Sequence, residues 1–253
     1  MRRIIVITII VGVAAVALHP VAVAGVDFIV PGVTLESVDF KAGADVSYLV
    51  IVHAYETSDT SVVRLSVQDV SDDFCVLEIS SGPFPSNEEE TATIRFRLAM
   101  RFKEYSTPDE IFDCIDQIRV RNGTEPFRIP TQDEIEEFDL KQILLNTNES
   151  RQRRTLPVQE VETRAGSFPC DVVEYTMRDV RAVNLGGVEA ERLREERSVL
   201  WFSSQIPFWG LVKSRVEMRR TTTILSASVP TAPQGKQTVT ESVLLSFKDP
   251  FAR

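Results

Sequence analysis

Runs rich in valine, isoleucine, leucine and phenylalanine, separated by short polar links, dominate the part of the chain between residues 44 and 102. Four such runs are present, at residues 44–55, 61–70, 74–80 and 91–102. In the second and fourth runs apolar and polar residues alternate, as in strands with one face towards the core and one towards water. Links this short make neighbouring strands antiparallel. The pattern therefore predicts four consecutive antiparallel strands.

The hydrophobic period changes to that of a helix after residue 106. Thr107-Pro-Asp-Glu110 is a capping box with proline at the first helical position. It precedes four apolar residues on one helical stripe, Ile111, Phe112, Ile115 and Ile118. Thr131-Gln-Asp-Glu134 repeats the start signal before a second apolar stripe. These signals predict two amphipathic helices, near residues 108–120 and 132–146.

Strands resume after the basic link Arg151-Gln-Arg-Arg154. The runs 171–183 and 188–203 flank a Gly-Gly pair and predict a hairpin, although residues 188–200 also fit a helix. Two further runs, at 212–226 and 236–247, complete the pattern. The expected fold is α+β and β-dominated, with nine or ten antiparallel strands and two helices.

The first 24 residues have the layout of a secretory signal. Arg2 and Arg3 precede an apolar run from Ile4 to Leu18, and Ala22-Val-Ala24 has the small-residue pattern of a cleavage site. A helix that spans a bilayer needs about 20 apolar residues, so this run is short for an anchor. We expect cleavage before Gly25, a periplasmic or extracellular location and one domain over residues 25–253. An uncleaved anchor and a division into two domains are the alternatives.

The composition narrows the classes of partner and chemistry. With 37 acidic and 28 basic residues the net charge is −9, which argues against nucleic acid and against electrostatic docking on anionic lipid. Cys75, Cys114 and Cys170 lack metal-site spacing, so neither a metal nor a cofactor is expected. In an oxidising compartment these cysteines predict one disulfide and one remaining thiol.

No motif for nucleophilic catalysis is present, and we expect no catalytic residues. Downstream of the signal the only histidine is His53, inside an apolar strand. A Ser-His or Cys-His pair would have to use this residue. A strand histidine with a structural role is the simpler interpretation.

The most unusual segment covers residues 201–213. It holds both tryptophans of the chain, beside two phenylalanines, in the order Trp201, Phe202, Phe208 and Trp209. Pro207 and Gly210 interrupt what would otherwise be one long strand, so a bend here directs large rings away from the ladder. The rings either plug one end of the core or line and gate an apolar cavity.

This segment carries a resemblance. Pro169-Cys-Asp-Val-Val-Glu-Tyr175, the Gly-Gly hairpin, Val199-Leu-Trp-Phe-Ser203 and Ile206-Pro-Phe-Trp-Gly-Leu-Val-Lys213 resemble exported bacterial proteins of the LolA/LolB-like type. The resemblance covers residues 165–220 and, before them, only the order of elements. It implies a strongly curved antiparallel half-barrel with helices packed in its concavity, and the carriage of lipid or of an acylated protein. The chain departs from such carriers in its longer N-terminal sheet and in the loop-rich residues 71–91.

Together these features predict non-catalytic binding of a hydrophobic ligand, a lipid or a lipoprotein, in the bacterial periplasm or envelope. The expected ligand-binding residues are apolar: Trp201, Phe202, Phe208, Trp209, Phe112 and Ile115. The first alternative is an envelope scaffold or assembly protein that binds another protein through its surface, and the second is a hydrolase with His53 near a serine. A carrier needs an apolar cavity of hundreds of Å³, which a scaffold does not.

Overall fold

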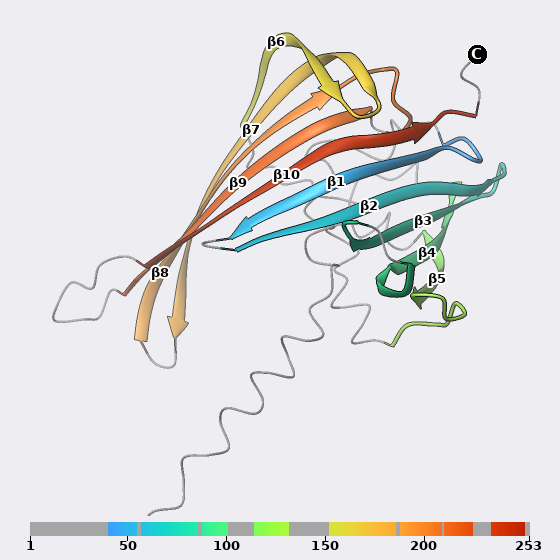
Figure 1. Cartoon of the computed structure of the whole chain (residues 1–253). Helices are drawn as coiled ribbons and strands as arrows, with labels where there is room; N and C mark the ends of the chain where they lie inside the picture. Colours follow the sequence, from blue (N-terminus) through green and yellow to red (C-terminus); the bar gives the residue numbers. More distant parts are fainter. Residues whose placement is uncertain are drawn as a thin grey trace, which may run out of the picture.

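The computed structural model describes residues 40–54, 57–85, 88–100, 114–131, 152–185, 188–208, 210–224 and 234–250. In this part of the chain the regular structure is almost entirely β (Figure 1). Ten strands are present: β1 Asp45–Ala54, β2 Thr57–Val70, β3 Phe74–Pro83, β4 Ala92–Ala99, β5 Ile115–Asn122, β6 Gln152–Thr163, β7 Gly166–Leu185, β8 Val188–Phe202, β9 Leu211–Ile224 and β10 Gln234–Lys248. One 3₁₀ turn, η2 Glu88–Glu90, precedes β4.

All ten strands form one antiparallel sheet in the order β5-β4-β3-β2-β1-β10-β9-β8-β7-β6. Strands that follow one another in the chain are neighbours in each half, and β1 pairs with β10 in the middle of the sheet. The β1–β10 ladder therefore joins a half built from β1–β5 to a half built from β6–β10. The prediction of nine or ten antiparallel strands is confirmed.

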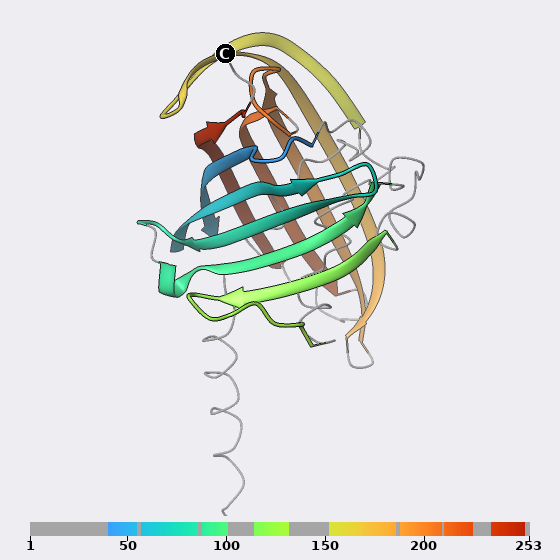
Figure 2. The same cartoon turned by 90° about the vertical axis from the view of Figure 1, so that its right-hand side faces the viewer.

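The sheet is strongly curved and does not close, because β5 and β6 form its two edges (Figure 2). We call the face that carries Tyr48, Leu65, Phe96 and Leu244 the inner face, and the opposite face the outer face. The four named side chains are at most 4% exposed. Successive residues of a strand point to opposite faces of the sheet, so the alternation of apolar and polar residues in the sequence places the apolar side chains on the inner face.

Two apolar clusters fill the inner face. The first cluster lies over β2–β5 and includes Leu77, Phe96 and Leu98. The second lies over β1, β2 and β7–β9 with β10, and includes Tyr48 and Leu200. The second cluster therefore crosses the β1–β10 ladder that joins the two halves of the sheet, whereas the first lies within the N-terminal half.

The predicted helix near residues 108–120 is wrong for its second half, because residues 115–122 form β5. This strand pairs with β4, and the register shifts between Arg97 and Leu98. A bulge of this kind lets two apolar residues three positions apart face the same side of a sheet. Ile115 and Ile118 both pack against the first cluster. Their spacing, typical of a helical stripe, is therefore the signature of a bulged edge strand.

Strand β6 replaces the link expected at residues 151–154. It is an edge strand whose side chains are mostly exposed, so it lacks the apolar alternation that identifies a half-buried strand. The β6–β7 register shifts between Leu156 and Gln159, which leaves Pro157 without a ladder partner. A proline is tolerated at an edge or a bulge. Residues 188–200, which also fitted a helix, belong to β8, and the predicted hairpin with β7 is confirmed.

The expected disulfide does not form: all three cysteines are buried thiols. Cys75 on β3 is paired with Leu98 on β4. The carbonyl of Cys114, which directly precedes β5, accepts a hydrogen bond from the N–H of Ala99 at the end of β4, so β4 lies between the two cysteines. Two strand spacings amount to about 9–10 Å, whereas a disulfide requires Cα atoms within about 7 Å of each other. Cys170 belongs to the second cluster.

Four of the predictions lie outside the described residues: the export signal at 1–24, the second helix at 132–146, and the site residues Phe112 and Trp209. Among the residues described, no helix is long and apolar enough to span a bilayer.

Candidate functional site

The turn between β8 and β9 packs against the inner-face core, because Ile206 belongs to the second cluster and Phe208 lies against it. The backbone N–H of Ser203 donates to the carbonyl of Gly210 at 2.7 Å, and the N–H of Ile206 donates to the carbonyl of Ser203 at 3.2 Å. Gly210 has φ +74°, and a Cβ built there would lie 2.7 Å from the Ser203 carbonyl oxygen. The turn therefore requires glycine at position 210.

Phe208 also has a positive φ, +64°, which is rare for a bulky residue. Such strain costs about 1–3 kcal/mol and persists only where the surroundings impose it. The ring of Phe208 packs against both apolar clusters and meets Phe40 edge-on, with ring centres 6.4 Å apart. The strained backbone thus places one aromatic ring between the two halves of the core.

The other predicted site residues in the described chain surround these clusters. Trp201 and Phe202, at the end of β8, are half-buried against the second cluster. The indole N–H of Trp201 donates to Oε1 of Gln159 at 2.9 Å, and Nζ of Lys213 lies 5.2 Å from the centre of an indole ring. Ile115 packs against the first cluster, as Phe208 does. The structure therefore places Ile115 at the first cluster and Trp201 and Phe202 at the second, while Phe208 contacts both.

The inner face of β7–β10 changes in character along the strands. The row at Leu200 joins four residues across the ladder: Val173, Leu200, Ser214 and Ser242. The row at Arg194, six residues away along β8, is highly charged: Asp179, Arg194, Arg220 and Lys236. Between them lie Met177 and Met218, on either side of Glu196. One continuous face therefore passes from a buried, uncharged row to a basic row over about 20 Å.

A pocket of about 930 Å³ lies at the basic end of this face. Its lining contains one acidic side chain, Asp179, and five basic ones: Arg181, Arg192, Arg194, Arg220 and Lys236. These five cations were not predicted as a cluster from the sequence. The signal was nevertheless present, because Arg192 and Arg194 are two positions apart and share a face on any strand.

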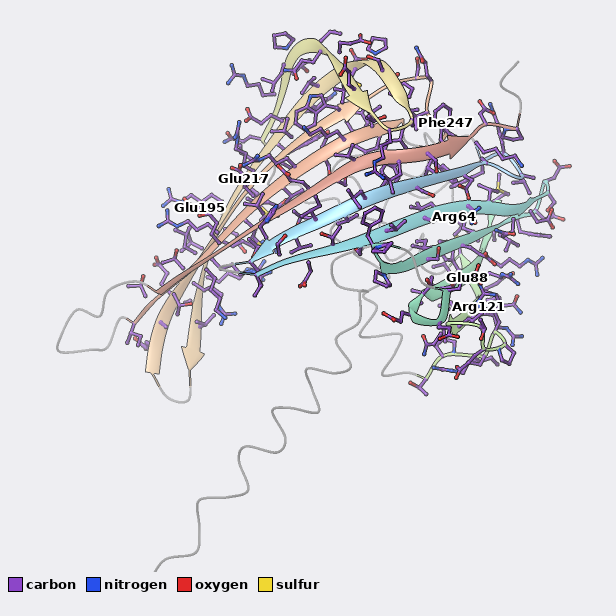
Figure 3. The ribbon with its side chains drawn as sticks, viewed as in Figure 1. Arg64, Glu88, Arg121, Glu195, Glu217 and Phe247 are labelled. Atoms are coloured by element: carbon purple, nitrogen blue, oxygen red, sulfur yellow. The ribbon has the colours of Figure 1, made fainter. Side chains whose placement is uncertain are left out.

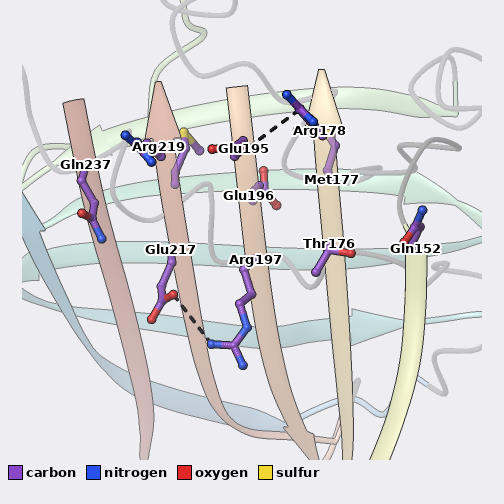
Figure 4. Close-up of a pocket in the computed structure, with 11 residues that line it drawn as sticks. Gln152, Thr176, Met177, Arg178, Glu195, Glu196, Arg197, Glu217, Arg219 and Gln237 are labelled. Carbon is purple, nitrogen blue, oxygen red and sulfur yellow. Dashed lines mark ion pairs between the residues drawn. The ribbon is translucent and has the colours of Figure 1, made fainter. Parts of the chain in front are cut away.

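A second pocket, of about 660 Å³, lies over the same strands and is lined largely by outer-face residues (Figures 3 and 4). Its charges are matched. Arg197 approaches Glu217 at 3.8 Å and Glu174 at 2.7 Å, and Arg178 approaches Glu195 at 3.9 Å. Because each cation has an acidic neighbour, this pocket offers little net charge to a ligand.

The hydrolase alternative gains no geometric support in the described part of the chain. His53 is exposed on β1, and Ser58 on β2 is its direct neighbour across the ladder. The described residues show no hydrogen bond between the two side chains, and His53 lines neither pocket. No group of three metal-ligating side chains occurs among the described residues either.

Comparison with known proteins gives a limited result. No family model matches the sequence, and no curated protein matches it. An exported protein with a YmcC-like fold from Bacteroides fragilis is similar at 10% identity and a TM-score of 0.33, over 84% of this chain and 98% of its own. A lipoprotein from Parabacteroides distasonis is similar at 13% identity and a TM-score of 0.33, over 83% of this chain and 97% of its own.

An outer membrane lipoprotein-sorting protein domain from Vibrio parahaemolyticus is similar at 10% identity and a TM-score of 0.29. The similarity covers 85% of this chain and 88% of that domain. Solved structures similar to this chain thus include a lipoprotein-sorting domain, the kind of protein that the aromatic segment resembles in sequence.

Proposed function

We propose that this protein binds a hydrophobic ligand, a lipid or the acyl chain of a lipoprotein, without converting it chemically, in the bacterial periplasm or envelope. The ligand contacts the inner face at the turn between β8 and β9. The observation that supports this most is the position of Phe208, whose strained backbone holds a half-buried ring against both apolar clusters.

The physical reason lies in the cost of that arrangement. A ring that only filled the core could be supplied from a regular strand at no backbone cost, because strand side chains already point inward. Backbone strain is concentrated at ligand clamps and switch regions. In an open sheet, a ring at the junction of two clusters can separate from one of them and admit an acyl chain between the two clusters.

The test is equilibrium binding of a fluorescent fatty-acyl probe to the lipid-stripped whole chain, with unfolding midpoints measured in parallel. Phe208→Ala should weaken binding by tenfold or more, equivalent to about 1.4 kcal/mol. Phe127→Ala is the matched control. Phe127 is also half-buried, but it lies between Arg95 and Arg121 and belongs to neither cluster. The control should bind the probe as the wild type does.

Two results would contradict the proposal. Absence of saturable binding by the wild type at micromolar protein would favour an envelope scaffold that binds another protein through its surface. Equal losses in both variants would mean that the probe does not occupy the Phe208 turn.

A further inference from the structure

The basic pocket differs from the rest of the charged surface in how its charges are paired across the ladder. Within it, three direct cross-strand pairs have the same sign: Arg181 with Arg192, Arg194 with Arg220, and Arg220 with Lys236. Side chains directly opposite one another lie about 5 Å apart at Cβ, so pairs of like charge destabilise a sheet. A folded chain has no structural reason to keep three of them together.

The outer face of the same strands shows the opposite arrangement. Arg178 is opposite Glu195, Arg197 is opposite Glu217, and Arg215 is opposite Glu241. The last pair forms an ion pair of 2.9 Å. The two faces share backbone, register and twist. The unmatched charges of the inner face are therefore a property of that face and not of these strands in general.

Two of the five cations of the pocket have acidic partners within the chain. Arg181 contacts Asp179 at 2.6 Å, and Arg194 contacts the buried Glu196 at 3.0 Å. Three others, Arg192, Arg220 and Lys236, make no ion pair with the described residues. The Nε donor of Arg194 is buried and also lacks a hydrogen-bond acceptor. A buried donor of this kind calls for an acceptor from elsewhere.

We propose that this pocket binds the phosphate group of an anionic amphiphile, whose chain extends along the inner face past Met177 and Met218. This inference rests on the proposed function and adds the class of headgroup. Arginine forks bind phosphate oxygens in bidentate geometry, and three unmatched cations suit a doubly charged phosphate monoester better than one carboxylate. The volume of about 930 Å³ accommodates a headgroup larger than a single ion.

The dimensions of the face agree with such a ligand. The row at Arg194 lies six residues from the row at Leu200, about 20 Å of strand. An acyl chain of a bilayer spans half of the hydrocarbon core, about 15 Å. Met177 and Met218 lie between the two rows. Their unbranched side chains adapt readily to an incoming chain.

The experiment compares three probes on the lipid-stripped whole chain: monolauroylglycerol 3-phosphate, uncharged monolauroylglycerol and glycerol 3-phosphate. Arg220→Gln removes an inner-face charge. Arg219→Gln removes the same charge from the adjacent residue, which points to the outer face opposite Glu195. The phosphorylated lipid should bind at least tenfold more tightly than the uncharged one. This preference should disappear in Arg220→Gln, persist in Arg219→Gln and decrease with salt.

The remaining outcomes separate the two proposals. Equal affinity for both lipids in every variant would overturn the headgroup site and leave hydrophobic binding in place. If glycerol 3-phosphate bound as tightly as the phosphorylated lipid, the pocket would be a site for soluble phosphate esters, and the amphiphile would be rejected. Binding of none of the probes would overturn both proposals.

Discussion

The hydroxyl of Tyr48 on β1 donates a hydrogen bond to the carbonyl of Leu211 at the start of β9, at a distance of 3.0 Å. Strand β10 lies between these two strands in the sheet. Tyr48 is 1% exposed, and its burial raises the pKa of the phenol well above the ordinary value. This hydrogen bond ties the N-terminal half of the sheet to the end of the aromatic turn.

Removing this hydroxyl should be costly. Tyr48→Phe keeps the ring but leaves the buried carbonyl of Leu211 without this donor, which should lower the free energy of unfolding by about 1–3 kcal/mol. Tyr175→Phe is the matched control. Tyr175 belongs to the same cluster, and no hydrogen bond of its hydroxyl occurs in the described part of the chain. Urea denaturation measures both variants, and equal losses would show that the Tyr48 bond contributes nothing particular.

Gly210 should resist substitution by alanine. A methyl group there meets the Ser203 carbonyl at 2.7 Å, on a backbone with φ +74°. We expect Gly210→Ala to cost about 2 kcal/mol or more, because steric overlap is added to strain of about 1–3 kcal/mol. Gly235→Ala on β10 is the control, since the nearest atom to its Cβ would be 3.6 Å away. Unfolding free energies within about 0.5 kcal/mol of each other would refute the geometry of the turn.

The strands of the fold were largely predictable from the sequence, because each half-buried strand carries its own alternation. The helix predicted near residues 108–120 was wrong in its second half because Ile115 and Ile118 are three positions apart. This apolar spacing fits a helix turn and a β-bulge equally well. Only the pairing of β5 with β4 distinguishes a helix turn from a β-bulge here, and this pairing cannot be inferred from residues 115–122 alone. Strand β6 escaped prediction because an exposed edge strand has no buried face to produce a pattern.

The site was predictable only in part. The cluster of aromatic residues near position 208 was visible because it is local in the sequence. The basic pocket was not, because its cations come from four different strands, β7, β8, β9 and β10. A net charge of −9 also suggested the absence of basic clusters. That total conceals the separation of matched charges on the outer face from unmatched cations on the inner face.

The cysteines provide a simple test of the sheet order. With β4 between Cys75 and Cys114, and Cys170 in the other cluster, we expect three thiols to react with Ellman's reagent in denaturant without added reductant. All three are buried, at most 1% exposed, so the native protein should react far more slowly. A count of one thiol in denaturant would mean that a disulfide forms, which the positions of the three cysteines in this sheet do not allow.

The stability should fall in alkaline solution, and Cys170 should account for the first part of the loss. Burial, with smaller contributions from Glu160 and Asp171, raises the pKa of this thiol from 9.0 to about 11. Below pH 9 the thiol is protonated in both folded and unfolded chains. Between pH 9 and about 11 only the unfolded chain releases the proton, so the free energy of unfolding decreases as the pH rises. Tyr48, whose pKa is also raised, adds a loss of the same sign above its ordinary value of 10.0.

The two contributions can be separated by mutation. Urea denaturation in the presence of reductant, at steps between pH 8 and pH 11, should show a decrease for the wild type that begins near pH 9. Cys170→Ala should have a flatter dependence between pH 9 and pH 10, because the variant has no thiol at this position to ionise in the unfolded chain. Tyr48→Phe should keep the wild-type decrease in that interval and flatten the dependence only above pH 10. An identical slope in wild type and Cys170→Ala between pH 9 and pH 10 would show that Cys170 ionises as readily in the folded chain as in the unfolded one.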